Sequence, residues 1–207
     1  LGWTEIVLYK KNKDFKWAIA RDNFLTESEC DDLVDRIKSN KEMIDNEDFI
    51  ERNGSWVSFN GDPIVDKIFK VVQLANQMCF KFNIGGVGGC YGKHYFVKDF
   101  ENLCENGPLH ADLSTEDGLV VESSEDGTEV YRDEGLEKEL DVFDTTTKLT
   151  VIVFLNDDFE GGDLVIWDSA IKVKKGRIVI FPSFAGHRVR KFTGKDRFVL
   201  ATFIKGD

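Results

Sequence analysis

Residues 148–155 read K-L-T-V-I-V-F-L, and this apolar, β-branched run is the strongest strand signal in the chain. It ends at Asn156-Asp157-Asp158, a turn-forming sequence. Further short apolar runs follow, separated by turns rich in glycine or aspartate. Short strands punctuated in this way predict a mainly β protein with a sandwich or jelly-roll core. The strands predicted after residue 155 are 163–167, 171–173, 177–181, 188–192 and 197–204.

The N-terminal part of the chain, residues 1–84, carries helix signals and predicts α-helices that support the β core. Thr26 and Glu29 form a capping-box pattern, and the apolar residues that follow recur with helical spacing. Asp62-Pro63 is a second helix start, because proline is favoured at the first helical position. The apolar stripe of this second helix continues to about Phe82.

Three shorter segments complete the expected order of elements. Residues 55–59 predict a strand between the two helices, and residues 91–98 predict the first strand of the β core. Residues 85–89 read G-G-V-G-G but lack the strand, glycine loop and helix order of a nucleotide-binding fingerprint. We therefore interpret them as a connector between helix and strand.

The composition suits a single domain of 207 residues, since 42% of the residues are hydrophobic and 12% are aromatic. We expect a helical region at 1–84 and a β core at 85–207, with an acidic insertion at 116–144. The insertion holds twelve acidic residues against two basic ones, a net charge of −10 out of −11 for the chain. Without a basic face there is no counterion release to drive nucleic-acid binding, so we expect no nucleic-acid partner.

The chain shows no sign of a membrane segment or of a disulfide framework. No apolar run approaches the ~20 residues that a membrane-spanning helix needs, so we expect no membrane partner and a soluble, intracellular (cytoplasmic) protein. The four cysteines contain no C-x-x-C pair, which favours reduced thiols over disulfides or a zinc site. They are Cys30, Cys79, Cys90 and Cys104.

The chemically most informative pattern is His110-Ala111-Asp112, followed by His187 and, ten positions later, by Arg197. Two imidazoles and one carboxylate bind one face of an Fe(II) ion and leave the opposite positions open. An arginine adds a planar, two-pronged anchor for a carboxylate. Since the chain has only three histidines, the use of two of them in this pattern favours a metal site.

The motifs in this region resemble those of the 2-oxoglutarate/Fe(II) oxygenases, in particular their prolyl 4-hydroxylase-like branch. The resemblance extends over roughly residues 91–204, with several motifs in the family's order. The motifs are P-L-H-A-D at 108–112, F-L-N-D at 154–157, F-E-G-G-D-L at 159–164, V-K-K-G-R at 173–177, H-R-V at 187–189 and G-K-D-R at 194–197.

The resemblance implies a double-stranded β-helix that binds Fe(II) and uses 2-oxoglutarate and O2, with ascorbate as a reductant. The implied metal ligands are His110, Asp112 and His187, the first two on one strand with their side chains on the same face. Arg197 would pair with the distal carboxylate of 2-oxoglutarate.

Other side chains are assigned with less support from the motifs. Tyr95 resembles the tyrosine that the family places on an early barrel strand near the co-substrate, and Tyr91 is a rival for that role. We interpret His94 as a histidine on the strand surface, and Trp167 and Phe203 as core residues.

The ordered motifs predict a non-haem Fe(II), 2-oxoglutarate-dependent dioxygenase that hydroxylates a protein or peptide side chain and releases succinate and CO2. Proline is the first expected target, although Lys148 stands near the position where prolyl hydroxylases carry a substrate-holding arginine. Asp112 favours hydroxylation, because halogenating relatives replace this carboxylate with Gly or Ala.

Two alternatives are the same chemistry on a free amino acid or other small molecule, and a non-catalytic metal-binding β-barrel module. The acidic insertion is either a solvated segment or a lid that favours a cationic substrate.

Overall fold

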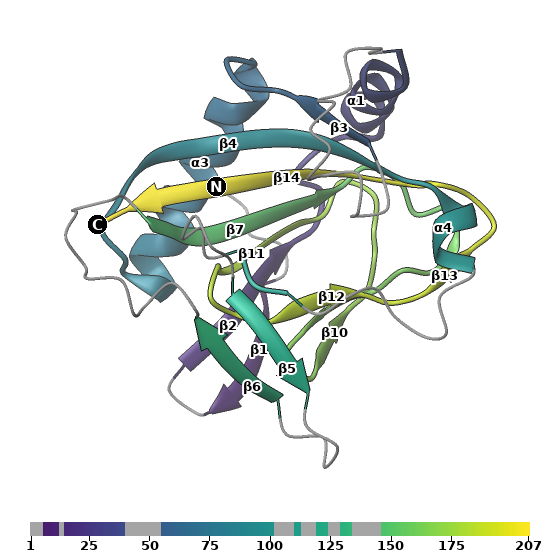
Figure 1. The fold of residues 1–207 in the computed structure, drawn as a ribbon. Helices are drawn as coiled ribbons and strands as arrows, with labels where there is room; N and C mark the ends of the chain where they lie inside the picture. Colours follow the sequence, from purple (N-terminus) through teal and green to yellow (C-terminus); the bar gives the residue numbers. More distant parts are fainter. Residues whose placement is uncertain are drawn as a thin grey trace.

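A seven-stranded antiparallel sheet dominates the computed structural model, which describes residues 6–12, 15–39, 55–101, 110–112, 119–123, 129–133 and 146–207 (Figure 1). Its strands are β1 (Ile6–Asn12), β2 (Phe15–Arg21), β3 (Ser55–Ser58), β4 (Ile84–Tyr95), β7 (Thr146–Phe154), β11 (Ile178–Pro182) and β14 (Arg197–Gly206). They are arranged in the order β1-β2-β11-β7-β14-β4-β3. The strand predicted at 148–155 is therefore β7, at the centre of the sheet.

This sheet has an apolar core on each face, because successive side chains of a strand point to opposite faces. In β7, Val151 and Val153 belong to one buried cluster, whereas Ile152 and Phe154 belong to the other. A central strand that is buried on both faces has no polar face, so its sequence is a continuous apolar run without alternation.

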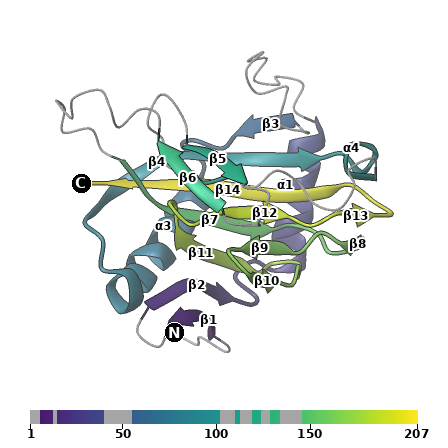
Figure 2. The ribbon, with the colours of Figure 1, turned by 60° about the horizontal axis from the view of Figure 1, so that its bottom comes forward.

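Two smaller sheets cover the face that carries Ile152 and Phe154 (Figure 2). One consists of β9 (Leu164–Ile166) between β10 (Ser169–Ile171) and β12 (His187–Val189). The other pairs β8 (Glu160–Gly161) with β13 (Phe192–Thr193). Together with the large sheet they form the predicted jelly-roll core, a double-stranded β-helix.

Two helices, α1 (Glu27–Ser39) and α3 (Pro63–Ala75), cover the opposite face of the large sheet (Figure 1). Both begin as predicted. Thr26 Oγ1 accepts a hydrogen bond from the Glu29 N–H at 3.2 Å, and the Glu29 carboxylate accepts one from the Thr26 N–H at 2.8 Å. Asp62 Oδ1 caps α3 by accepting from the Ile64 N–H at 2.9 Å. α3 continues into one π-helical turn, η1 (Asn76–Phe80).

The prediction that residues 1–84 form a helical region is wrong for residues 6–21. These form the β1–β2 hairpin, in which β2 pairs with β11, with Ile19 opposite Ile180, and β1 is the edge strand of the large sheet. The partner strand is far away in sequence, so local periodicity does not reveal this pairing.

The interpretation of residues 85–89 as a connector is also wrong, because they lie within β4. β4 ends at Tyr95, before the predicted end of the strand at 98, and α4 (Val97–Glu101) follows. The glycines pair with β14, with Gly89 opposite Phe203. A Cβ atom at Gly89 would come within 2.6 Å of the Tyr91 ring, so this part of the strand needs the space that glycine leaves.

Part of the acidic insertion forms a hairpin of β5 (Leu119–Ser123) and β6 (Glu129–Asp133). The rest of residues 116–144 lies outside the described residues. The two interpretations of the insertion, as a solvated segment or as a lid, fall on those residues and stay untested. Among the described helices, none has the length and apolar character needed to cross a membrane.

Candidate metal centre

His110, Asp112 and His187 come together although more than 70 residues separate the first two from the third. One nitrogen or oxygen atom from each side chain lies within 4.8 Å of the other two. His187 Nε2 is 3.2 Å from Asp112 Oδ2, and His110 Nε2 is 3.8 Å from Asp112 Oδ1. Two imidazoles and a carboxylate at such distances are a donor set for a divalent transition metal.

Backbone pairing explains why these residues meet. His110 and His187 form an isolated antiparallel bridge with two N–H···O bonds, at 3.0 Å and 2.8 Å. The Asp112 N–H donates to the Ser183 carbonyl at 2.9 Å. His110 and Asp112 are thus held by a bridge to β12 and the turn before it, whereas the family resemblance implies one continuous strand.

The exposure of the three side chains indicates from which side the cluster is open. The side chains of His187 and Asp112 are 6% and 12% exposed, whereas that of His110 is 41% exposed. Solvent or a ligand therefore reaches the cluster on the His110 side.

The orientation of His187 is fixed by a hydrogen bond on the far side of its ring. Its Nδ1 lies 3.1 Å from the carbonyl oxygen of Ala185, which can only accept. Nδ1 therefore carries a proton, and Nε2 is the ring nitrogen on the side of Asp112 that could bind a metal. Such an outer hydrogen bond sets the tautomer of metal-binding histidines.

The Asp112 carboxylate has a partner that the sequence did not reveal. Thr150, in the middle of β7, donates from Oγ1 to Asp112 Oδ2 at 2.9 Å. The same Oγ1 lies 3.0 Å from the Ser183 hydroxyl. Both hydroxyl side chains are fully buried. A threonine inside a buried apolar run needs a polar partner, which is the signal that could have pointed to it.

Arg197 begins β14, and only 1% of it is exposed. Its guanidinium carbon lies 4.9 Å from the Tyr95 ring centre and 5.4 Å from the Phe154 ring centre. Nε and Nη1 have no hydrogen-bond partner among the described residues. Burial lowers the pKa of this guanidinium, and Tyr95 acts in the opposite direction. Two buried donors without an acceptor suit a carboxylate ligand.

The segment around Arg197 is held from both sides. Asn156 donates to the Asp196 carbonyl and accepts from the Phe198 N–H, each at 2.8 Å. The Asp196 carboxylate accepts from the Val97 N–H at 2.9 Å and lies 2.7 Å from His94 Nε2. Burial by itself would raise the pKa of Asp196, but these two contacts outweigh it and the pKa is lowered.

The interpretation of His94 as a surface histidine is wrong, because its side chain is only 15% exposed and stacks on Phe198. The register also separates the two candidate tyrosines. Tyr95 lies opposite Arg197, whereas Tyr91 lies opposite Ala201. Trp167 and Phe203 pack against the core as expected.

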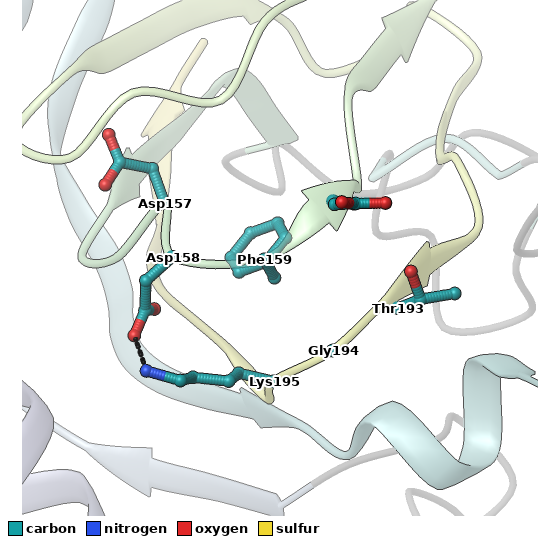
Figure 3. A pocket seen from close by; sticks show the side chains of 7 residues that line it. Asp157, Asp158, Phe159, Thr193, Gly194 and Lys195 are labelled. Atoms are coloured by element: carbon teal, nitrogen blue, oxygen red, sulfur yellow. Dashed lines mark hydrogen bonds and ion pairs between the residues drawn. The ribbon is translucent and has the colours of Figure 1, made fainter.

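Two surface hollows in the described part of the chain contain no residue of the metal cluster. One, of about 460 Å³, lies between Asp158, Phe159 and the turn at Gly194 (Figure 3). Lys195 crosses it to pair with Asp158 at 2.7 Å. The other, of about 590 Å³, adjoins it and also borders α1. Lys175 pairs with Asp31 and Lys195 with Asp158 at the rims, and we assign no ligand to either hollow.

Comparison with known proteins identifies relatives of this chain. Residues 127–205 match the family model of the 2OG-Fe(II) oxygenase superfamily. A 65-residue segment is 38% identical to a PKHD-type hydroxylase of Psychrobacter sp. (strain PRwf-1). That match covers 28% of this chain and 25% of the hydroxylase, so the chain spans about a quarter of the relative's length.

Solved structures share the fold at low sequence identity. The viral collagen prolyl hydroxylase of Paramecium Bursaria Chlorella virus-1, in complex with 2OG, superposes with a TM-score of 0.61 at 15% identity. The alignment covers 93% of this chain and 97% of the viral one. A Pseudomonas putida prolyl-4-hydroxylase gives a TM-score of 0.56 at 14% identity, with 92% of each chain covered. At these identities the likeness shows the fold alone.

Proposed function

We propose that this chain is a prolyl 4-hydroxylase-like member of the 2OG-Fe(II) oxygenase superfamily and that it hydroxylates a protein or peptide side chain. Proline is the target we place first. The observation that carries the proposal is the cluster of His110, Asp112 and His187 in a fold that also buries the unpartnered donors of Arg197.

The cluster would hold Fe(II) through three protein ligands on one face. His187 is oriented by the contact of its Nδ1 with the Ala185 carbonyl, and Asp112 is held by Thr150. When bound, Fe(II) with 2-oxoglutarate and O2 supplies the oxidation that hydroxylates a C–H bond and leaves succinate and CO2. The chain would hold the metal and its ligands in position, and the substrate would approach from the side on which His110 is exposed.

Arg197 would bind the distal carboxylate of 2-oxoglutarate with Nε and Nη1, which have no other acceptor among the described residues. Tyr95 packs against the guanidinium and limits the ways in which a dicarboxylate can lie. The apolar wall beside them, Phe154 among its members, keeps water from this end of the site.

Lys148 lies on β7 two residues before Thr150, at a bulge in the pairing of β7 with β14. It is half-buried. We assign it to the substrate side of the metal cluster, where a cation would contact a peptide carbonyl or a carboxylate.

The test is succinate formation by the purified protein with Fe(II), ascorbate, O2 and 2-oxoglutarate, with and without proline-rich and lysine-rich peptides. We expect turnover to rise with the proline-rich peptides. The Asp112→Ala variant should lose all turnover, whereas Asp35→Ala, at an exposed position of α1, should keep it.

Other outcomes distinguish the alternatives. Unchanged turnover in Asp112→Ala would contradict the metal assignment. Succinate formation that small amino acids stimulate, and peptides do not, would favour a small-molecule hydroxylase. Metal binding without any 2-oxoglutarate turnover would favour a non-catalytic module.

A further inference from the structure

A second buried cation lies beside Arg197. Lys93 is two residues before Tyr95 on β4, so the two side chains share one face of the sheet. Only 7% of Lys93 is exposed. Its Nζ lies 4.4 Å from the Trp56 ring centre and 4.2 Å from the Tyr95 ring centre.

The Tyr95 ring therefore has two cations around it, the Lys93 ammonium and the Arg197 guanidinium. In the pairing of β4 with β14, Lys93 lies opposite Val199 and Tyr95 lies opposite Arg197. The two pairs are two residues apart along the strands and therefore on the same face of the sheet. In the described part of the chain, neither cation has a carboxylate partner. Other lysines differ, because Lys67, Lys174 and Lys195 each pair with an aspartate or glutamate.

Two buried like charges without a counter-ion are unfavourable. Burial of each charge costs free energy unless it is paired, and their mutual repulsion adds to the cost. The contacts with Trp56 and Tyr95 stabilise an ammonium only modestly compared with that cost. An arrangement of this kind is expected where a ligand brings the missing negative charge.

We propose that Lys93 and Arg197 form a two-cation site for a carboxylate around Tyr95, and that its occupant is the distal carboxylate of 2-oxoglutarate. The inference rests on the function proposed above. Arg197 offers two fixed donors, and Lys93 adds a mobile charge on a flexible stem. A carboxylate has lone pairs for both, because it accepts up to about four hydrogen bonds. Lys93 thus becomes a residue that selects a dicarboxylate over a monocarboxylate co-substrate.

An acidic side chain of the substrate is the other source of the same chemistry. The distal carboxylate is favoured because Lys93 and Arg197 both lie against the Tyr95 ring, beside which the proposed function places 2-oxoglutarate. The site is also deep in the β core, beside the buried Phe154 and Val199. A small co-substrate reaches such a place more readily than a peptide side chain.

The test uses Lys93→Met, which keeps the stem and removes the charge. Calorimetry without O2, on protein loaded with Mn(II), gives the dissociation constants of 2-oxoglutarate and of pyruvate, which lacks the distal carboxylate. We expect the Kd of 2-oxoglutarate to rise at least tenfold while the Kd of pyruvate changes less than twofold. Lys93→Arg should restore much of the 2-oxoglutarate affinity.

The matched control is Lys67→Met. Lys67 also lies over an aromatic ring, that of Phe24, but it is on the surface of α3 and pairs with Glu29. Its replacement should leave both affinities unchanged. Thermal unfolding of each variant checks the fold, and Lys93→Gln provides a second neutral replacement.

Two results would overturn the proposal, an unchanged Kd for 2-oxoglutarate in Lys93→Met and equal weakening of 2-oxoglutarate and pyruvate. If the Kd is unchanged and stimulation by peptides that contain Asp or Glu is lost, Lys93 is assigned to the substrate instead. If wild-type protein binds Mn(II) but not 2-oxoglutarate, the proposed function fails together with this inference.

Discussion

Thr150 donates a 2.9 Å hydrogen bond to the Asp112 carboxylate, and this contact links the central strand of the large sheet to the metal cluster. The acceptor is Oδ2, the oxygen that also lies 3.2 Å from His187 Nε2. Thr150 is fully buried between β11 and β14, so its hydroxyl has a fixed position. The carboxylate that completes the donor set is therefore oriented by the jelly-roll core.

Thr150→Val should weaken metal binding while the fold is kept. Valine has nearly the same shape, but it leaves Asp112 Oδ2 without its donor. Loss of such an outer hydrogen bond lowers metal affinity roughly 10- to 100-fold. Titration with Mn(II) or Co(II) in a calorimeter measures the change, and Thr150→Ser should restore most of the affinity.

Thr202→Val is the control for that experiment. Thr202 is another fully buried threonine of the large sheet, and its hydroxyl contacts the Cys90 sulfur at 3.2 Å, outside the metal cluster. Equal losses of metal affinity in both variants would mean that Thr150 acts only through stability.

Asn156→Ala should affect 2-oxoglutarate and leave the metal in place. The Asn156 side chain bonds the backbone on both sides of Arg197, at Asp196 and Phe198. Without it the guanidinium loses its fixed position, and we expect the Kd of 2-oxoglutarate to rise several-fold. Loss of two hydrogen bonds to a partly buried backbone also costs about 1–3 kcal/mol of stability. A matching loss of Mn(II) affinity would contradict this division of roles.

Sequence reasoning was most successful where one local signal was sufficient. The run at 148–155 has no explanation other than a buried element of this length, and it is β7. The caps at Thr26 and Asp62 are local hydrogen-bond patterns, and both are present. The spacing of the histidines and Asp112 predicted a cluster that the structure brings together.

The features that the sequence missed depend on partners far along the chain. Residues 15–21 form strand β2 because they pair with the backbone of β11, and β1 pairs with β2 in turn. The glycines of β4 are in a strand because β14 pairs with them. In the sequence Thr150 is an ordinary strand residue, because its partner Asp112 is 38 residues away along the chain. Lys93 gave no sequence signal, because its meaning comes from the rings and the cation around it.

Asp22 should make the stability of the fold depend on pH at acid values. Hydrogen bonding by Arg177 is the main cause that holds the pKa of Asp22 below its ordinary 3.8, against the effect of burial, and Lys174 adds to it. A depressed pKa in the folded state stabilises the protein above the unfolded value. This contribution is lost as the pH falls through the lower, folded-state pKa.

Urea unfolding of wild type and Asp22→Asn between pH 2 and pH 7 tests this expectation. The variant should lose about 1–3 kcal/mol of stability at pH 7, and its curve should be flatter below about pH 4. Asp35→Asn, with an exposed carboxylate on α1, is the control. Parallel curves for wild type and Asp22→Asn would contradict the assignment.

Cys30 and Cys90 should be unreactive in the folded protein, because burial raises the pKa of each thiol to about 11. At pH 8 roughly one thiol in a thousand is then a thiolate, the reactive form, and both side chains are fully buried. Cys79 is partly exposed and is in no disulfide with the described residues, and it serves as the internal reference. Iodoacetamide labelling read by peptide mass spectrometry should modify Cys79 first, and the two buried thiols only when urea unfolds the chain. Because Cys30 lies on the buried face of α1, its labelling at the rate of Cys79 would mean that α1 does not stay packed on the sheet.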